Sequence, residues 1–153
     1  MNMQNNPGRF VDNNMDIIND RLSRRSNIGH HLGPASDVAV GSVDFALAAL
    51  NFNDVHNPNT ATAQGFLGQI AAALKPGGTL DFIDHAGNNG ADNATLHRIT
   101  FEDAVSAIVN SGQFALVGSS DILDNPANDH SVGPFDPGLG RNTDRFLLKF
   151  VKL

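Results

Sequence analysis

Two adjacent polar residues, Asp84 and His85, follow a short apolar segment at residues 79–83 and could carry out acid–base chemistry. A neutral imidazole can act as a base or orient a substrate, and a neighbouring carboxylate can fix its tautomer. In open α/β sheets, ligands bind just outside the carboxyl ends of the strands. We therefore expect Asp84 and His85 to lie at a binding site, and a hydrogen-bonded turn is the alternative.

A second polar cluster, residues 51–54, follows the apolar run at residues 42–50. The side chains of Asn51 and Asn53 can hydrogen-bond an amino or carbonyl group, and Asp54 can hold a cation or accept a proton. This cluster is the second place where a site is expected. An Asx-turn that caps the next segment is an equally good interpretation.

His97 and Arg98 stand just before the expected helix start at Thr100. His97 could meet His85 across one opening, and Arg98 could bind a substrate or pair with Asp84 as a structural clamp. Imidazole and carboxylate groups also suit a metal ion, so a metal-assisted hydrolase using His85, His97 and Asp84 is a further hypothesis. The three residues lack the i, i+4 spacing of helical metal ligands.

Residues 124–143 form a long segment rich in Pro, Gly and Asp, which predicts a loop. Asp129, His130 and Asp136 lie in it, and Arg141 and Asp144 lie at its end. A substrate lid is one interpretation. Pairing of Arg141 with a nearby Asp, or a simple lead into the last strand, explains the same residues.

The stretch 74–85 supplies the elements that position these groups. Lys75 suits the carboxyl end of a helix, and Pro76 cannot continue one. Gly77 and Gly78 permit a sharp reversal before a strand at residues 79–83. Helices are also expected from Met15 to Leu22, from Asn59 or Thr60 to Lys75 and from Thr100 to Gly112, and strands at 42–50, 114–117 and 146–151.

The run at residues 42–50 is almost continuously apolar. Such a run predicts an inner strand that is buried on both faces of a parallel sheet. Its alanine content leaves a short helix open on periodicity alone.

The order of elements from Ser42 is strand, helix, strand, helix, strand, long loop, strand. Alternating strands and helices predict an α/β fold with a mostly parallel sheet. The last two strands have no helix between them, so we expect an antiparallel strand at one edge.

The composition excludes several classes of protein. The net charge of −6 gives no electrostatic support to nucleic-acid or membrane partners. The 153 residues contain no Cys, which excludes disulfides and thiolate chemistry. No apolar run reaches the roughly 20 residues of a membrane span, and the amino terminus lacks a signal-peptide core. We therefore expect a cytoplasmic protein.

The segment "LKPGG" with its following strand, "DHAGNNGADNATLHRITFEDAVSAIVNSGQFALVGSSDIL" and "NPANDHSVGPFDPGLGRNTDRFLLKF" resemble the C-terminal portion of class I S-adenosylmethionine-dependent methyltransferases, in particular one group of predicted bacterial enzymes. The resemblance implies a partial Rossmann-like fold, S-adenosylmethionine as cofactor and an unknown small-molecule substrate. It implies catalytic roles for Asp54, His85 and His97, cofactor contacts by Asn51, Phe52 and Asn53, and substrate contacts by Asp84 and Arg98. Asn53 stands where that group has a histidine, so proton transfer at this position is lost.

The first half of the family pattern is absent from this sequence. No glycine-rich loop follows a strand, and no acidic residue closes a second strand to bind ribose. We therefore expect residues 1–35 to form a polar arm with a short helix, and residues 36–153 to form one incomplete methyltransferase-like domain. The domain could be inactive in consequence. The alternative is a non-catalytic interaction or oligomerisation module, in which a partner chain or a second copy completes the sheet.

Overall fold

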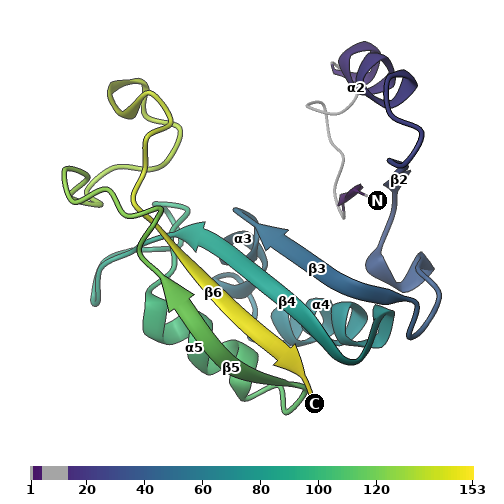
Figure 1. The fold of residues 1–153 in the computed structure, drawn as a ribbon. Coiled ribbons are helices and arrows are strands. Elements are labelled where there is room, and N and C mark those ends of the chain that lie inside the picture. The colour runs from purple at the N-terminus through teal and green to yellow at the C-terminus, as the bar shows by residue number, and fades with distance from the viewer. Residues whose placement is uncertain (1, 5–13) are drawn as a thin grey trace.

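The computed structural model describes residues 2–4 and 14–153, and its centre is a four-stranded sheet with the strand order β3, β4, β6, β5 (Figure 1). β3 and β4 are parallel, whereas β6 is antiparallel to both of its neighbours. The strands are β3 (Val43–Ala49), β4 (Leu74–His85), β5 (Phe114–Ser120) and β6 (Arg145–Lys152). The α/β class and the antiparallel pairing at one edge are confirmed, with β6 on the inner side of the pair and β5 outermost.

Three helices lie on one face of this sheet (Figure 1). They are α3 (Phe52–His56), α4 (Thr60–Ala73) and α5 (Phe101–Val109). The side chain of Asn59 accepts a hydrogen bond from the Ala61 amide, and that of Thr100 accepts one from the Asp103 amide. Both expected helix starts are therefore capped by side chains that satisfy otherwise unpaired amide groups.

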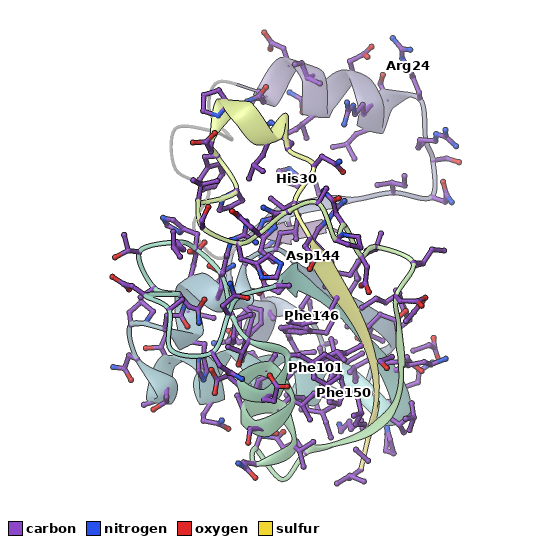
Figure 2. All side chains as sticks on the ribbon, turned by 90° about the vertical axis from the view of Figure 1, so that its left-hand side faces the viewer. Arg24, His30, Phe101, Asp144, Phe146 and Phe150 are labelled. Carbon is purple, nitrogen blue, oxygen red and sulfur yellow. The ribbon has the colours of Figure 1, made fainter. Side chains whose placement is uncertain are left out.

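The core fills the space between these helices and the sheet. Phe82 of β4 lies edge-on to Phe52 at 5.1 Å between ring centroids and stacks on Phe146 at 6.3 Å. Phe101 of α5 meets Phe146 from the helix side, and Figure 2 shows Phe101, Phe146 and Phe150 together between α5 and the sheet. Further buried side chains come from both layers: Leu67, Ile70, Leu74, Leu80, Ala104, Ile108, Phe114 and Leu148.

The junction between α4 and β4 differs from the expected one. α4 ends at Ala73, and Leu74 is already extended, fully buried and paired with Val43. Lys75 therefore lies outside the helix, and its ammonium group contacts Asp44 at 2.6 Å. The register shifts before Thr79 pairs with Phe45, and Gly77 adopts a φ of 73° within this irregularity. Burial of Leu74 against the sheet has ended the helix earlier than Lys75 and Pro76 alone indicate.

β3 is a strand, as predicted, but it is an edge strand and not an inner one. Phe45 and Leu47 keep 52% and 55% of their surface exposed, and Ala48 is the one buried residue of the strand. The prediction of burial on both faces was therefore wrong for the described residues. The elements that would cover the outer side of β3 have no counterpart in the part of the chain that the structure describes.

The amino-terminal elements lie before this layered unit. β1 (Asn2–Gln4) pairs in parallel with β2 (His30–Leu32), and α2 (Met15–Ser23) lies between them in the sequence. A short 3-10 helix, η1 (Ala35–Asp37), leads to β3. Residue 1 and residues 5–13 of the expected polar arm lie outside the described residues, and the division at residues 35 and 36 stays a prediction. None of the helices described is long and apolar enough to cross a membrane.

The conformation of Gly77 makes a testable prediction about the α4–β4 junction. Gly77→Ala should lower the free energy of unfolding by about 1 kcal/mol, because a side chain at φ 73° is strained. Gly65→Ala is the matched control, because Gly65 lies in α4 with open space around it, and should raise that free energy by about 0.5–1 kcal/mol. Urea unfolding measures both. Equal effects of the two substitutions would contradict the assigned backbone at residue 77.

Candidate functional site

A hydrogen-bonded pair of Asp54 and His97 lies at the carboxyl end of the sheet. Nδ1 of His97 lies 2.7 Å from Oδ1 of Asp54. Asp54 is placed there by α3, which begins three residues after β3 ends, and His97 lies in the connection between β4 and α5 with a φ of 50°. A carboxylate at Nδ1 fixes the imidazole tautomer and leaves Nε2 as the proton acceptor.

The second carboxylate, Asp84, is buried and ties the end of β4 to the start of α3. Its Oδ2 accepts from the Asn53 amide at 2.9 Å, and its Oδ1 accepts from Asn53 Nδ2 at 2.7 Å. Oδ1 also accepts from the His85 amide at 2.8 Å. Burial raises the pKa of Asp84 above its ordinary value, the bonds from Asn53 and His85 oppose that rise, and the nearby charge of Asp54 adds to it. These contacts leave Asp84 no surface for a substrate.

His85 is half-buried at the end of β4, where it pairs with Arg145 at the start of β6. Its Nδ1 lies 2.8 Å from the hydroxyl of Thr143. Desolvation lowers the pKa of His85 from 6.5 to about 4, and the positive charges of Arg98 and Arg145 act in the same direction. At neutral pH the ring is therefore uncharged and can donate or accept a hydrogen bond without becoming a cation.

The residues expected to contact a cofactor divide between the surface and the core. Asn51 is exposed, and its side chain makes no capping bond to α3. Phe52 belongs to the core between Phe66 and Phe82. Asn53 is buried, and its Oδ1 has no hydrogen-bond partner among the described residues. Of these residues, Asn51 has the side chain that a ligand can reach directly.

Arg98 acts as a structural clamp, but not with Asp84, the partner that the sequence suggested. It is fully buried, and its guanidinium donates to the carbonyls of Ala86 and Val132 and to the side chain of Asn128. A fully buried guanidinium with these partners cannot contact a substrate, so the suggested substrate contact by Arg98 is corrected to a structural role. The clamp holds the long loop over the end of β4.

The long loop also supplies residues that the sequence reasoning did not place in the site. Phe135 lies edge-on to the His97 ring at 5.7 Å, and Thr143 contacts His85. His130 lies between Asn88 and Asp144, at 2.9 Å and 2.8 Å. It thereby connects the long loop to the loop that follows β4. No residue spacing indicated these contacts, because they join positions 14 to 58 residues apart.

The metal-assisted hydrolase finds no support in this arrangement. Within residues 2–4 and 14–153, the structure brings together no group of three or more His, Cys, Asp or Glu side chains that could hold a metal ion. Asp84 is fully engaged by Asn53 and His85.

Solved structures share this fold. The chain resembles an S-adenosylmethionine-dependent methyltransferase from Aquifex aeolicus with a TM-score of 0.65 and 13% identity, over 99% of this chain and 67% of that one. The [4+2]-cyclase SpnF gives 0.59 and 16%, over 90% and 61%. A chain of the Haloferax volcanii complex that contains the Trm112 methyltransferase activator gives 0.59 and 18%, over 88% and 66%. No protein-family model and no curated protein matches the sequence.

These likenesses establish the fold as that of the S-adenosylmethionine-dependent methyltransferases, in a chain that spans about two thirds of the length of those structures. The residues present fit one wall of a cofactor site. Asn51 is accessible at a strand end, and the unpaired Oδ1 of Asn53 lies beside it in the sequence. The opposite wall, a glycine-rich loop, has no counterpart in this sequence.

The lowered pKa of His85 predicts a pH dependence of stability. On acidification, the unfolded chain takes up a proton at this histidine near 6.5, whereas the folded chain does so only near 4. The contribution of His85 to stability is thus fully present above pH 6.5 and is lost as the pH falls toward 4. The difference in unfolding free energy between the parent and His85→Gln should shrink over that interval. An NMR titration that places the His85 pKa at its ordinary value would contradict this.

Proposed function

We propose that this chain is an S-adenosylmethionine-dependent methyltransferase-like domain that acts on the N–H or O–H group of a small molecule. One observation carries the proposal: the hydrogen-bonded Asp54–His97 pair at the carboxyl end of the sheet, in a fold that methyltransferases use. Ligands of such sheets bind at this end. The fold alone would be insufficient support, because a [4+2]-cyclase shares it.

In this proposal, Nε2 of His97 takes the proton from the N–H or O–H group of the substrate, while Asp54 holds Nδ1. His85, uncharged at neutral pH and near enough to Asp54 and His97 to be affected by their charges, hydrogen-bonds the substrate as well. Asn53 and Asp84 are positioning residues, because their buried hydrogen bonds fix the start of α3 and hence Asp54. When bound, S-adenosylmethionine would supply an activated methyl group, and Asn51 and Asn53 would lie on its side of the site.

Calorimetric titration of the folded chain with S-adenosylmethionine tests the proposal. We expect saturable binding that His97→Gln leaves unchanged within about twofold, because His97 serves the acceptor and not the cofactor. Asn51→Leu should weaken binding, because it removes the accessible amide at the strand end. A chain with cooperative unfolding and no heat of binding would overturn the enzymatic function.

A second candidate function, a non-catalytic interaction module, rests on the uncovered edge of the sheet. β3 presents Phe45 and Leu47 to solvent, and an open strand edge also exposes unpaired backbone groups. A second copy or a partner chain on β3 would cover both. The Haloferax volcanii complex contains an activator chain, which makes association with a partner a reasonable property to test for this fold.

Light scattering coupled to size-exclusion chromatography tests self-association through β3. We expect a dimer for the parent chain and a monomer for Leu47→Lys, because the charge would be buried in the shared interface. Val117→Lys is the matched control, because Val117 is also 55% exposed but lies on β5 at the opposite edge. A monomeric parent chain would exclude self-association, and dissociation of the control would place the interface elsewhere.

A further inference from the structure

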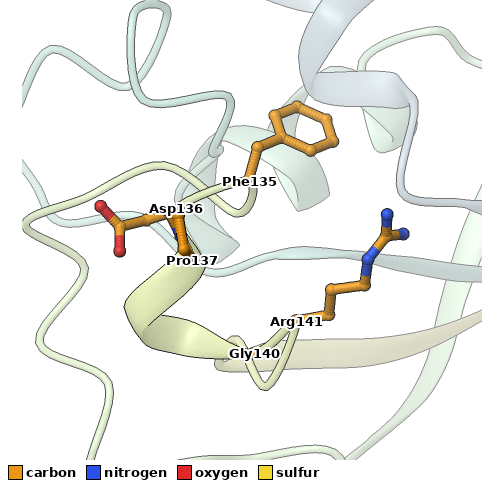
Figure 3. A pocket seen from close by; sticks show the side chains of 5 residues that line it. All are labelled: Phe135, Asp136, Pro137, Gly140 and Arg141. Carbon is orange, nitrogen blue, oxygen red and sulfur yellow. The ribbon is translucent and has the colours of Figure 1, made fainter.

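The end of the long loop forms an open pocket beside the Asp54–His97 pair. The pocket has a volume of about 420 Å³ and is lined by Phe135, Asp136, Pro137, Gly140 and Arg141 (Figure 3). All five residues come from one loop, which the Arg98 clamp and the His130–Asp144 contact hold in place. The lining is therefore positioned on an anchored segment.

Phe135 connects this pocket to the proposed catalytic pair. Its ring contacts His97 at 5.7 Å and yet remains 76% exposed. An exposed aromatic ring next to a proline offers an apolar surface on which a planar ligand can stack. A ligand in the pocket would lie against Phe135 and so next to His97.

Arg141 supplies the pocket's positive charge. Its guanidinium forms no ion pair or hydrogen bond with any described residue, although the sequence suggested pairing with an Asp. The neighbouring acid, Asp144, is instead paired with His130. A guanidinium that is free and planar suits a carboxylate, which it can bind through two parallel hydrogen bonds.

Asp136, the acidic residue among the described residues of the lining, does not cancel that charge. Oδ1 of Asp136 accepts a hydrogen bond from the Gly138 amide at 2.7 Å. Figure 3 shows its carboxylate on the other side of the Pro137 turn from Phe135 and Arg141. The half of the pocket between Phe135 and Arg141 is therefore apolar and cationic.

We propose that this pocket is a substrate subsite for an aromatic carboxylate, whose ring stacks on Phe135 and whose carboxylate binds Arg141. The assignment rests on the proposed function and deepens it. It names the class of molecule whose N–H or O–H group would reach His97. It adds two binding residues, Phe135 and Arg141, that lie outside the strand ends.

Anthranilate is a suitable probe, because it is a fluorescent aromatic carboxylate and the chain contains no Trp or Tyr to interfere. We expect its fluorescence to change saturably on titration with the parent chain, without any cofactor. Arg141→Asn should weaken binding about tenfold or more, and Asn tolerates the φ of 66° at this position. Arg141→Lys should retain part of the affinity, because it keeps the positive charge but loses the planar guanidinium that can form two parallel hydrogen bonds.

Three controls make the result specific. Anthranilamide, which lacks the negative charge, should bind much more weakly than anthranilate. Phe135→Ala should weaken binding, whereas Arg24→Gln should not, because Arg24 is the residue that follows α2 and is paired with Asp20. Absence of anthranilate binding, equal binding of the amide, or binding that is insensitive to Arg141→Asn would each overturn the subsite. Since no cofactor is added, failure here is distinguishable from a failure to bind S-adenosylmethionine.

Discussion

The buried hydrogen bonds between Asp84 and Asn53 are the constraint on which the site depends. They join the end of β4 to the start of α3 through two residues that are 31 positions apart in the sequence. A carboxylate without solvent is costly unless donors surround it, and here three N–H groups do so. With that contact in place, α3 has one position relative to the sheet, and Asp54 on its first turn is directed toward His97.

The long loop depends on a comparable polar anchor. Arg98 extends from the segment after β4 and donates to backbone carbonyls and to Asn128, so the loop is held by a buried cation and not by an apolar core of its own. This anchor brings Phe135 against His97 and Thr143 against His85. The proposed catalytic groups and the proposed aromatic carboxylate subsite thus share one support.

The sheet is asymmetric in a way that bears on both candidate functions. Its helix-covered side is filled by Phe, Leu and Ile, whereas β3 leaves Phe45 and Leu47 in solvent. This chain covers only 67% and 66% of the length of two of the similar solved chains. The proposed interaction module depends on this exposed strand, whereas the proposed methyltransferase-like function depends on the Asp54–His97 pair at the carboxyl end of the same sheet.

The sequence by itself determined the layered α/β class, the capped starts of α4 and α5 and the strand-end location of residues 51–54, 84 and 85. These follow from local patterns: apolar periodicity, Asn and Thr caps, and the Pro-Gly-Gly junction. Only the tertiary structure decided that Arg98 is a clamp, that Asn53 and Asp84 face each other, and that Phe135 and Arg141 flank a pocket. The same holds for the edge position of β3, since an apolar run has the same sequence whether or not a neighbour covers it. The Arg98 clamp and the Asn53–Asp84 pair are contacts between distant segments, which packing selects and which residue spacing does not encode.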